Sequence, residues 1–134
     1  MTENADVKVN INANTNGTAW NYALGSDGKE YGYKWLGGNG GGNNGNVEYN
    51  ADGDSRTVTV TFNGSDGDDY TFDAFINLSG SPDLSGSVDA ANNSIVITDK
   101  CMTVGTLKWG AVVSVNNTDP KVTFFCDPYI RNRS

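Results

Sequence analysis

Apolar and polar residues alternate along most of this chain, which is the pattern of β-strands. Residues 6–13 and 56–62 show it most clearly, with apolar side chains at every second position. Because successive side chains of a strand point to opposite faces, each segment is predicted to be a strand with one buried face. Polar turns separate these from similar segments at 18–24, 30–36, 70–76, 88–98, 103–109, 110–115 and 121–126.

The regular succession of short strands predicts the fold class. We expect an all-β protein, an antiparallel β-sandwich of about eight strands that is immunoglobulin-like or jelly-roll in character. Its 134 residues predict a single domain over 1–134. Residues 37–46 contain only Gly and Asn, and they are predicted to form a flexible loop. The expected core consists of Val9, Ile11, Trp20, Tyr22, Tyr33, Trp35, Val58, Val60, Phe62, Phe72, Ile95, Ile97, Leu107, Val113 and Phe124.

An aromatic hairpin is the most distinctive local pattern. An Asp-Gly pair at 27–28 predicts a two-residue turn, which would place Trp20 opposite Trp35 and Tyr22 opposite Tyr33 on one face. We interpret these rings as core, because the opposite face offers only small, polar and charged residues. The alternative is that the four rings are exposed and stack on sugars as a ligand-binding face.

The composition of the chain disfavours some classes of function. The net charge of −7 and the pI of about 4.3 disfavour binding to nucleic acid or to anionic membranes. No segment reaches the length of a transmembrane span. The first residues resemble no secretory signal, so we expect a cytoplasmic protein.

Catalytic chemistry has few candidates in this sequence. The chain contains no histidine (His 0), which excludes the Ser-His-Asp and Cys-His arrangements. Most carboxylates lie in turns, where turn chemistry explains them. Asp73 alone lies between apolar residues of a predicted strand, and one carboxylate is not an acid–base pair. We therefore predict that the protein is not an enzyme.

Two smaller groups of residues are further candidates for a site. Asp66, Asp68 and Asp69 lie in one turn and could form an irregular calcium site, the alternative being a solvated turn. Cys101 and Cys126 lack metal-ligand spacing, and we interpret them as small buried hydrophobes, with a single disulfide as the alternative.

The end of the chain carries a motif. Asp127, Pro128, Ile130 and Asn132 resemble the tail of the small bacterial DP-EP proteins, which end in Asp-Pro, an apolar residue, Asn and then Glu-Pro. This resemblance implies a compact bacterial β domain and no assigned activity. Pro128 cannot donate to a sheet ladder, so we expect it to end the last strand or to lie at an edge.

These observations predict a non-catalytic binding or protein-interaction module. Its partner would be a protein or a second copy of the chain, since small sandwiches have edge strands that can self-associate. The alternative is a carbohydrate-binding module that uses the aromatic face, with or without calcium.

Overall fold

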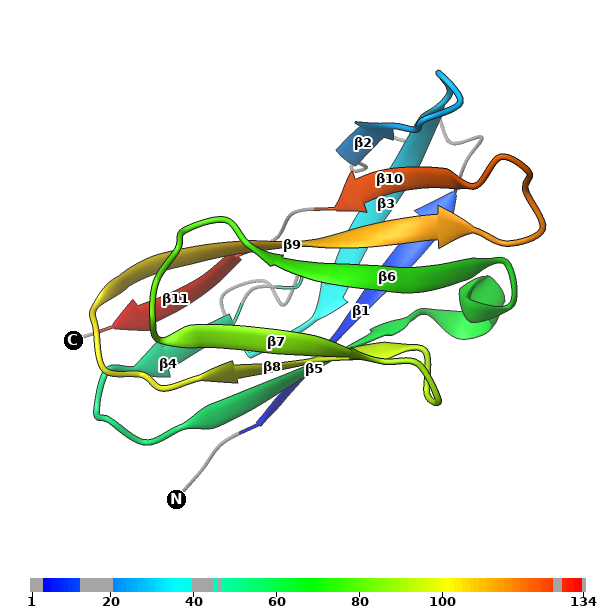
Figure 1. The fold of residues 1–134 in the computed structure, drawn as a ribbon. Coiled ribbons are helices and arrows are strands. Elements are labelled where there is room, and N and C mark those ends of the chain that lie inside the picture. The colour runs from blue at the N-terminus through cyan, green and yellow to red at the C-terminus, as the bar shows by residue number, and fades with distance from the viewer. Residues whose placement is uncertain (1–3, 13–20, 40–44, 46, 127–128, 134) are drawn as a thin grey trace.

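The computed structural model describes residues 4–12, 21–39, 45, 47–126 and 129–133. These residues form strands joined by turns, which confirms the all-β prediction (Figure 1). Within these ranges no helix has the length and apolar character needed to cross a membrane. The strands are β1 (Ala5–Asn12), β2 (Asn21–Leu24), β3 (Glu30–Gly37), β4 (Val47–Asn50), β5 (Arg56–Phe62), β6 (Tyr70–Asn77), β7 (Leu84–Asp89), β8 (Ser94–Asp99), β9 (Gly105–Val115), β10 (Val122–Cys126) and β11 (Tyr129–Arg133), with one 3-10 helix, η2 (Gly64–Asp68).

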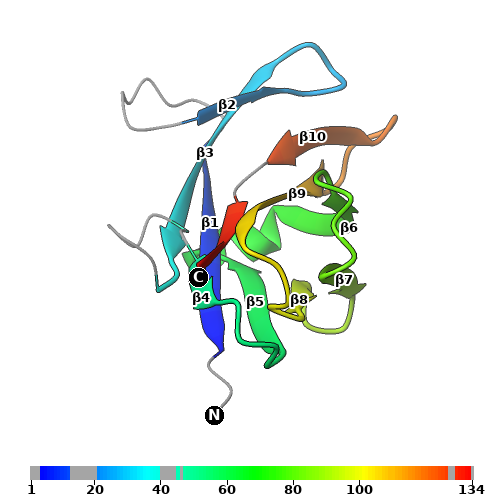
Figure 2. The ribbon, with the colours of Figure 1, turned by 90° about the vertical axis from the view of Figure 1, so that its left-hand side faces the viewer.

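Two sheets pack against each other (Figure 2). Sheet 1 has six strands in the order β2-β3-β1-β5-β8-β7. Sheet 2 has the order β10-β9-β11-β4, with β6 on β9 as well. Along β9, β10 pairs with the second half and β11 pairs with the first half, and both pairs follow the same register. The structure thus confirms the two-sheet character of the predicted sandwich.

The pairing differs from the prediction in two places. β1 pairs with β5 in parallel, and β11 pairs with β4 in parallel, so the sheets are not purely antiparallel. Neither pair is joined by a hairpin, so no turn fixes its direction. The described part of the chain also has eleven strands instead of about eight. The additional strands β4 and β11 are short: β4 alternates over only four residues, and the sequence of β11 does not alternate.

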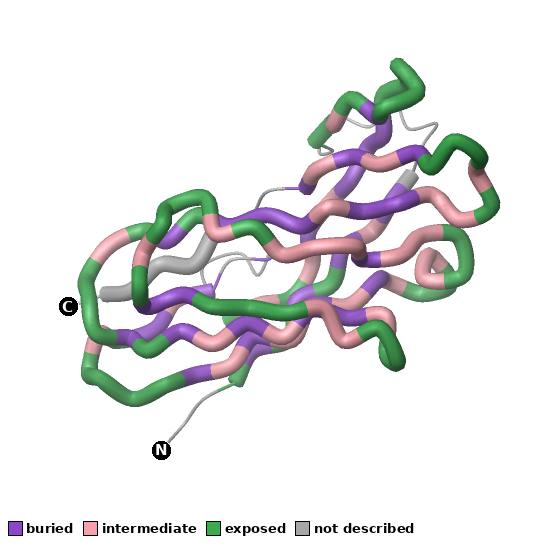
Figure 3. The backbone as a smooth tube through the Cα atoms, viewed as in Figure 1, coloured by how far each residue is buried: buried purple, intermediate pink, exposed green. Residues whose placement is uncertain are grey.

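The core lies between the sheets, where buried stretches of both sheets face each other (Figure 3). Val7, Val9, Val58 and Val60 are fully buried at the inward positions of β1 and β5. All predicted core residues in the described part of the chain are buried except Tyr22, which is 47% exposed. Trp20 lies outside the described residues. Ring contacts join the layers, including Trp35–Trp109 at 5.4 Å, Phe62–Phe72 at 4.0 Å and Tyr31–Phe124 at 4.6 Å between centroids.

The register of the β2–β3 hairpin corrects the prediction by one residue. Asn21, not Tyr22, lies opposite Tyr33. The predicted two-residue turn is instead a longer loop over 25–29, closed by the Gly25 N–H, which donates to the Lys29 carbonyl. Because a one-residue shift moves every side chain to the other face, Tyr22 and Leu24 point outward while Tyr33 points into the core.

Polar side chains bridge the edges of the two sheets. Asn93, in the β7–β8 turn, donates to the Tyr70 carbonyl and accepts the Phe72 N–H of β6, each at 3.0 Å. Asn77 of β6 donates to the Leu84 carbonyl of β7 at 3.1 Å. These amides join strands that share no ladder in the described part of the chain, and they hold the β6 and β7 edges together.

Candidate binding site

The predicted aromatic face is not formed by the described residues. Tyr33 and Trp35 are 4% and 5% exposed, and Trp35 packs edge-on against Trp109 in the core. Tyr22 is exposed on the opposite face of the hairpin, and Trp20 lies outside the described residues. The prediction that Tyr22 shares a face with Tyr33 and Trp35 is therefore wrong. The burial of Tyr33 and Trp35 agrees with our interpretation of these two rings as part of the core. Carbohydrate binding stays a prediction.

The three turn carboxylates are not gathered into a site. Asp66 lies in η2, and its Oδ2 accepts the Ile11 N–H at 2.8 Å, which ties this short helix to β1. Asp68 and Asp69 are exposed. Among the described residues, no group of three or more His, Cys, Asp or Glu side chains could hold a metal ion. The described geometry gives no support to calcium binding at Asp66, Asp68 and Asp69, which stays a prediction.

Both cysteines are buried and no disulfide joins them, which confirms their interpretation as small buried residues. Cys101 follows β8 with a left-handed φ of 55°. Burial raises the pKa of the Cys101 thiol, and the neighbouring Arg56 opposes this only in part. A buried thiol with a raised pKa is a poor nucleophile, so Cys101 is a structural residue.

At one end of the sandwich three loops, 51–55, 78–83 and 100–104, lie close together (Figure 1). Arg56 anchors the first loop from the start of β5, although it is only 5% exposed. Its guanidinium makes two hydrogen bonds to the Asp52 carboxylate, at 2.7 and 2.9 Å, and one to the Asn50 carbonyl. It also lies over the Tyr49 ring, 5.3 Å from the centroid. The hydrogen bonds from Arg56 lower the pKa of Asp52 to about 2.

Asp83 fixes the other two loops to each other. Its Oδ2 accepts hydrogen bonds from the Met102 N–H, the Thr103 N–H and the Thr103 hydroxyl, at 2.8 to 3.0 Å. Its carbonyl accepts the Lys100 N–H at 2.9 Å. Burial raises the pKa of Asp83, but the hydrogen bonds from Thr103 and Met102 outweigh burial, so the net pKa is lowered. The carboxylate therefore stays ionised at neutral pH and holds the backbone of 102–103 in place.

The fixed loop presents two apolar side chains to solvent. Met102 is 68% exposed and Val104 is 63% exposed. The Cys101 carbonyl accepts the Gly53 N–H at 2.9 Å, which ties the 51–55 loop to the same segment. We call the segment 101–104 the Met102 loop. Sequence analysis missed it because Met102 and Val104 alternate with polar Thr103, which is also the pattern of a strand.

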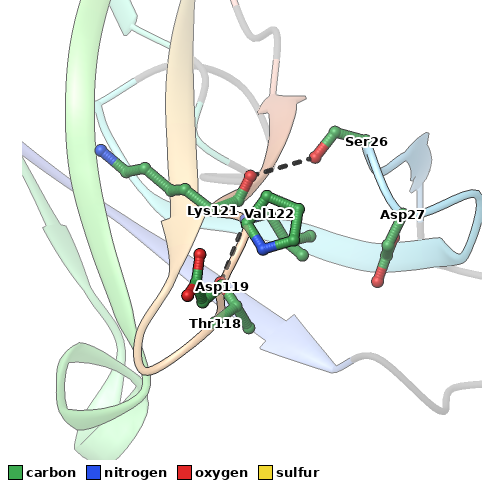
Figure 4. Close-up of a pocket in the computed structure, with 7 residues that line it drawn as sticks. Ser26, Asp27, Thr118, Asp119, Lys121 and Val122 are labelled. Carbon is green, nitrogen blue, oxygen red and sulfur yellow. Dashed lines mark hydrogen bonds between the residues drawn. The ribbon is translucent and has the colours of Figure 1, made fainter.

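At the other end of the molecule, the β2–β3 turn meets the β9–β10 loop around a hollow of about 280 Å³ (Figure 4). The Ser26 N–H donates to the Thr123 carbonyl, and the Ser26 hydroxyl accepts the Thr123 N–H. The Lys121 ammonium points away from the hollow and pairs with Asp73 at 2.7 Å. Two carboxylates, Asp27 and Asp119, lie on the rim.

The Asp27 carboxylate on the rim is poorly suited to act as a general acid. The Tyr31 hydroxyl donates to the Asp27 carboxylate at 2.7 Å and lowers its pKa. Burial and the same hydrogen bond raise the pKa of Tyr31 to about 12. A general acid at neutral pH needs a raised carboxyl pKa, which Asp27 does not have. The Tyr31–Asp27 contact instead ties the turn to β3, and the Tyr31 ring stacks on Phe124 of β10.

Comparison with known proteins assigns no function to either end of the sandwich. The C-terminal residues that resemble the DP-EP tail form β11, which pairs with β4 and β9, while Asp127 and Pro128 lie outside the described residues. That resemblance therefore stays a prediction. No protein-family model matches this chain, and no curated protein matches it.

Proposed function

We propose that this protein is a non-catalytic interaction module that inserts the Met102 loop into an apolar cleft of a partner protein. The observation that carries the proposal is the combination of exposure and anchoring at one short segment. Met102 and Val104 are among the most exposed large apolar side chains of the described residues, yet the backbone between them is fixed by Asp83.

Anchoring matters for affinity because ordering a loop on binding is costly. Fixing one backbone residue costs roughly 1–2 kcal/mol, and a loop that is already ordered does not lose this again when a partner binds. Methionine is also well suited to contact, since its flexible, polarisable side chain adapts to irregular apolar surfaces.

The absence of catalysis is supported by the residues themselves. The sequence has no histidine, and the carboxylates of Asp27, Asp52 and Asp83 are engaged in hydrogen bonds that lower their pKa values. A cytoplasmic location is part of the proposal. It is supported by the two cysteines, which lack a disulfide, as is usual in a reducing compartment.

The test compares three forms of the purified, immobilised chain. These are the wild type, the double variant Met102→Ser with Val104→Ser, and the control Leu24→Ser. Leu24 is 72% exposed on β2, so the control removes a similarly exposed apolar side chain away from the loop. Proteins captured from the source cells are quantified, and any candidate is purified and titrated against all three forms.

We expect one purified partner to bind the wild type and the Leu24→Ser control with the same Kd in a saturable manner. The double variant should bind at least tenfold more weakly, which corresponds to about 1.4 kcal/mol. Unchanged melting temperatures would show that all three forms are folded. If every captured protein binds the double variant as tightly as the wild type, the Met102 loop is not the contact site.

A further inference from the structure

Met102 carries the one sulfur atom of the described residues that solvent reaches readily. It is 68% exposed, whereas Cys101 and Cys126 are fully buried. The other methionine of the sequence is Met1, which lies outside the described residues. A thioether has no proton to lose before it reacts, whereas a thiol reacts as its thiolate. An oxidant in solution therefore reaches the Met102 thioether before it reaches either thiol.

The backbone on both sides of Met102 is fixed, and this keeps its side chain at the surface. The N–H groups of Met102 and Thr103 donate to the Asp83 carboxylate at 3.0 and 2.9 Å. On the other side, the Cys101 carbonyl accepts the Gly53 N–H at 2.9 Å. All of these bonds use backbone atoms of the Met102 loop, so a chemical change at the Met102 sulfur breaks none of them.

Oxidation by a hydroperoxide is a two-electron step that makes this side chain polar. A lone pair of the Met102 Sδ attacks one oxygen of the peroxide, the O–O bond breaks and an S–O bond forms. With hydrogen peroxide, the departing hydroxide takes the proton of the transferred oxygen and leaves as water. The thioether is oxidised to a sulfoxide and the peroxide is reduced. Two thiols of a methionine sulfoxide reductase reverse the step, forming a disulfide while the sulfoxide oxygen leaves as water.

The sulfoxide is unsuited to the contact that the thioether would make. Its oxygen accepts hydrogen bonds strongly, and an apolar cleft offers no donor to replace the water that it loses on burial. At 68% exposure Met102 contributes little to the core, and changes at such surface positions have small effects on stability. Oxidation therefore alters the binding surface while the sandwich stays folded.

We propose that Met102 is a reversible oxidation site, where reaction with a cellular hydroperoxide releases the Met102 loop from its partner. The release rests on the proposed function, because it needs a partner that holds this loop. The site of oxidation does not, since exposure and anchoring belong to the chain alone. Methionine matters here because leucine would fill an apolar cleft with a similar volume but could not be oxidised.

The first test needs no partner. The full chain is treated with hydrogen peroxide, and its peptides are followed by mass spectrometry. Met102 should gain one oxygen atom at a rate within about threefold of its rate in the urea-unfolded chain, while Cys101 and Cys126 gain none in that time. The melting temperature should change by less than about 3 °C.

Hydrophobic-interaction chromatography reports the change at the surface in the same samples. The oxidised chain should elute earlier than the untreated chain, and methionine sulfoxide reductases with dithiothreitol should restore the original elution. Met102→Leu is the matched control, because it keeps Met1 and an apolar residue at position 102. Peroxide should leave the elution of this control unchanged.

The second test titrates a purified partner that binds the wild type and not the double variant of the Met102 loop. Peroxide-treated wild type should bind at least tenfold more weakly than the untreated protein, and reductase treatment should restore the Kd. Met102→Leu should bind with the same Kd before and after peroxide treatment.

The outcomes separate this proposal from the proposed function. Oxidation of Met102 that is more than about tenfold slower than in the unfolded chain, or that needs loss of the fold, overturns the oxidation site. Equal binding of the oxidised and untreated chains overturns the release, while the partner contact stands. If no partner distinguishes the wild type from the double variant, the proposed function fails and the release fails with it, whereas the first test still decides the oxidation site.

Discussion

At the scale of single residues, two nearly buried charged groups shape the loop end of the sandwich. Arg56 is 5% exposed and Asp83 is 3% exposed. A buried charge is tolerated only when its hydrogen bonds are satisfied. The two terminal nitrogens of Arg56 meet this demand with Asp52 and Asn50, although its Nε has no hydrogen-bond partner, and Asp83 meets it with the backbone of the Met102 loop. The loops are therefore held by charged hydrogen bonds in addition to apolar packing.

Replacing Asp83 should weaken the whole domain. Asp83→Ala leaves the Met102 and Thr103 N–H groups without their acceptor, and a hydrogen bond to a charged group contributes about 1.5–3 kcal/mol. We expect the free energy of unfolding in urea to fall by roughly 2–4 kcal/mol. Asp54→Ala, at an exposed carboxylate of the neighbouring loop, is the control and should stay within about 0.5 kcal/mol of the wild type. Equal effects of the two substitutions would contradict this role for Asp83.

Stability should fall in acid partly through Asp52. Its pKa is lowered from 3.8 to about 2 in the folded chain by the hydrogen bonds from Arg56. A lowered folded-state pKa stabilises the protein above pH 3.8, and this contribution is lost as the pH falls towards 2. Melting temperatures measured between pH 5 and pH 2 should therefore fall less steeply for Asp52→Asn than for the wild type. Parallel curves for the two proteins would show that Asp52 contributes nothing to acid sensitivity.

At the scale of elements, the sequence predicted the strands well but could not predict how some of them pair. The alternation of Val58, Val60 and Phe62 with threonines defines β5 and its inward face, because burial itself creates that pattern. The β2–β3 register depends instead on the length of the turn. An Asp-Gly pair fits several turn lengths, so Tyr22 was assigned to the wrong face.

The contact between β9 and β10 offers a test of packing at this scale. Gly110→Ala would push a methyl group into the Phe125 ring, and overpacking of this kind costs about 1–3 kcal/mol. In a Phe125→Ala background the same substitution should be nearly neutral, because the ring is gone. Urea unfolding of the four proteins in this double-mutant cycle measures the coupling. Additive effects would mean that the ring does not depend on Gly110.

At the scale of the whole molecule, an all-β sandwich follows from composition and periodicity, whereas its candidate binding end does not. The Met102 loop depends on Asp83, which lies about twenty residues away in the loop between β6 and β7. Contacts between loops that are distant in sequence leave no periodic signal.

The burial of both cysteines in the core predicts how slowly their thiols react. Cys101 and Cys126 are both fully buried and are not joined by a disulfide. A thiol reagent should label neither residue rapidly in the native protein, and it should label both in guanidinium chloride. Rapid labelling of one thiol under native conditions would show that the core around it opens locally.

Deamidation of Asn93 should weaken the contact between β6 and the β7–β8 turn as the protein ages. Its nitrogen donates to the Tyr70 carbonyl while its oxygen accepts the Phe72 N–H, so it needs both halves of an amide. Slow deamidation to aspartate would keep the acceptor but replace the donor with a negative oxygen facing a carbonyl. Aged preparations that carry this lesion should therefore begin to exchange amide protons along β6 before the rest of the core does.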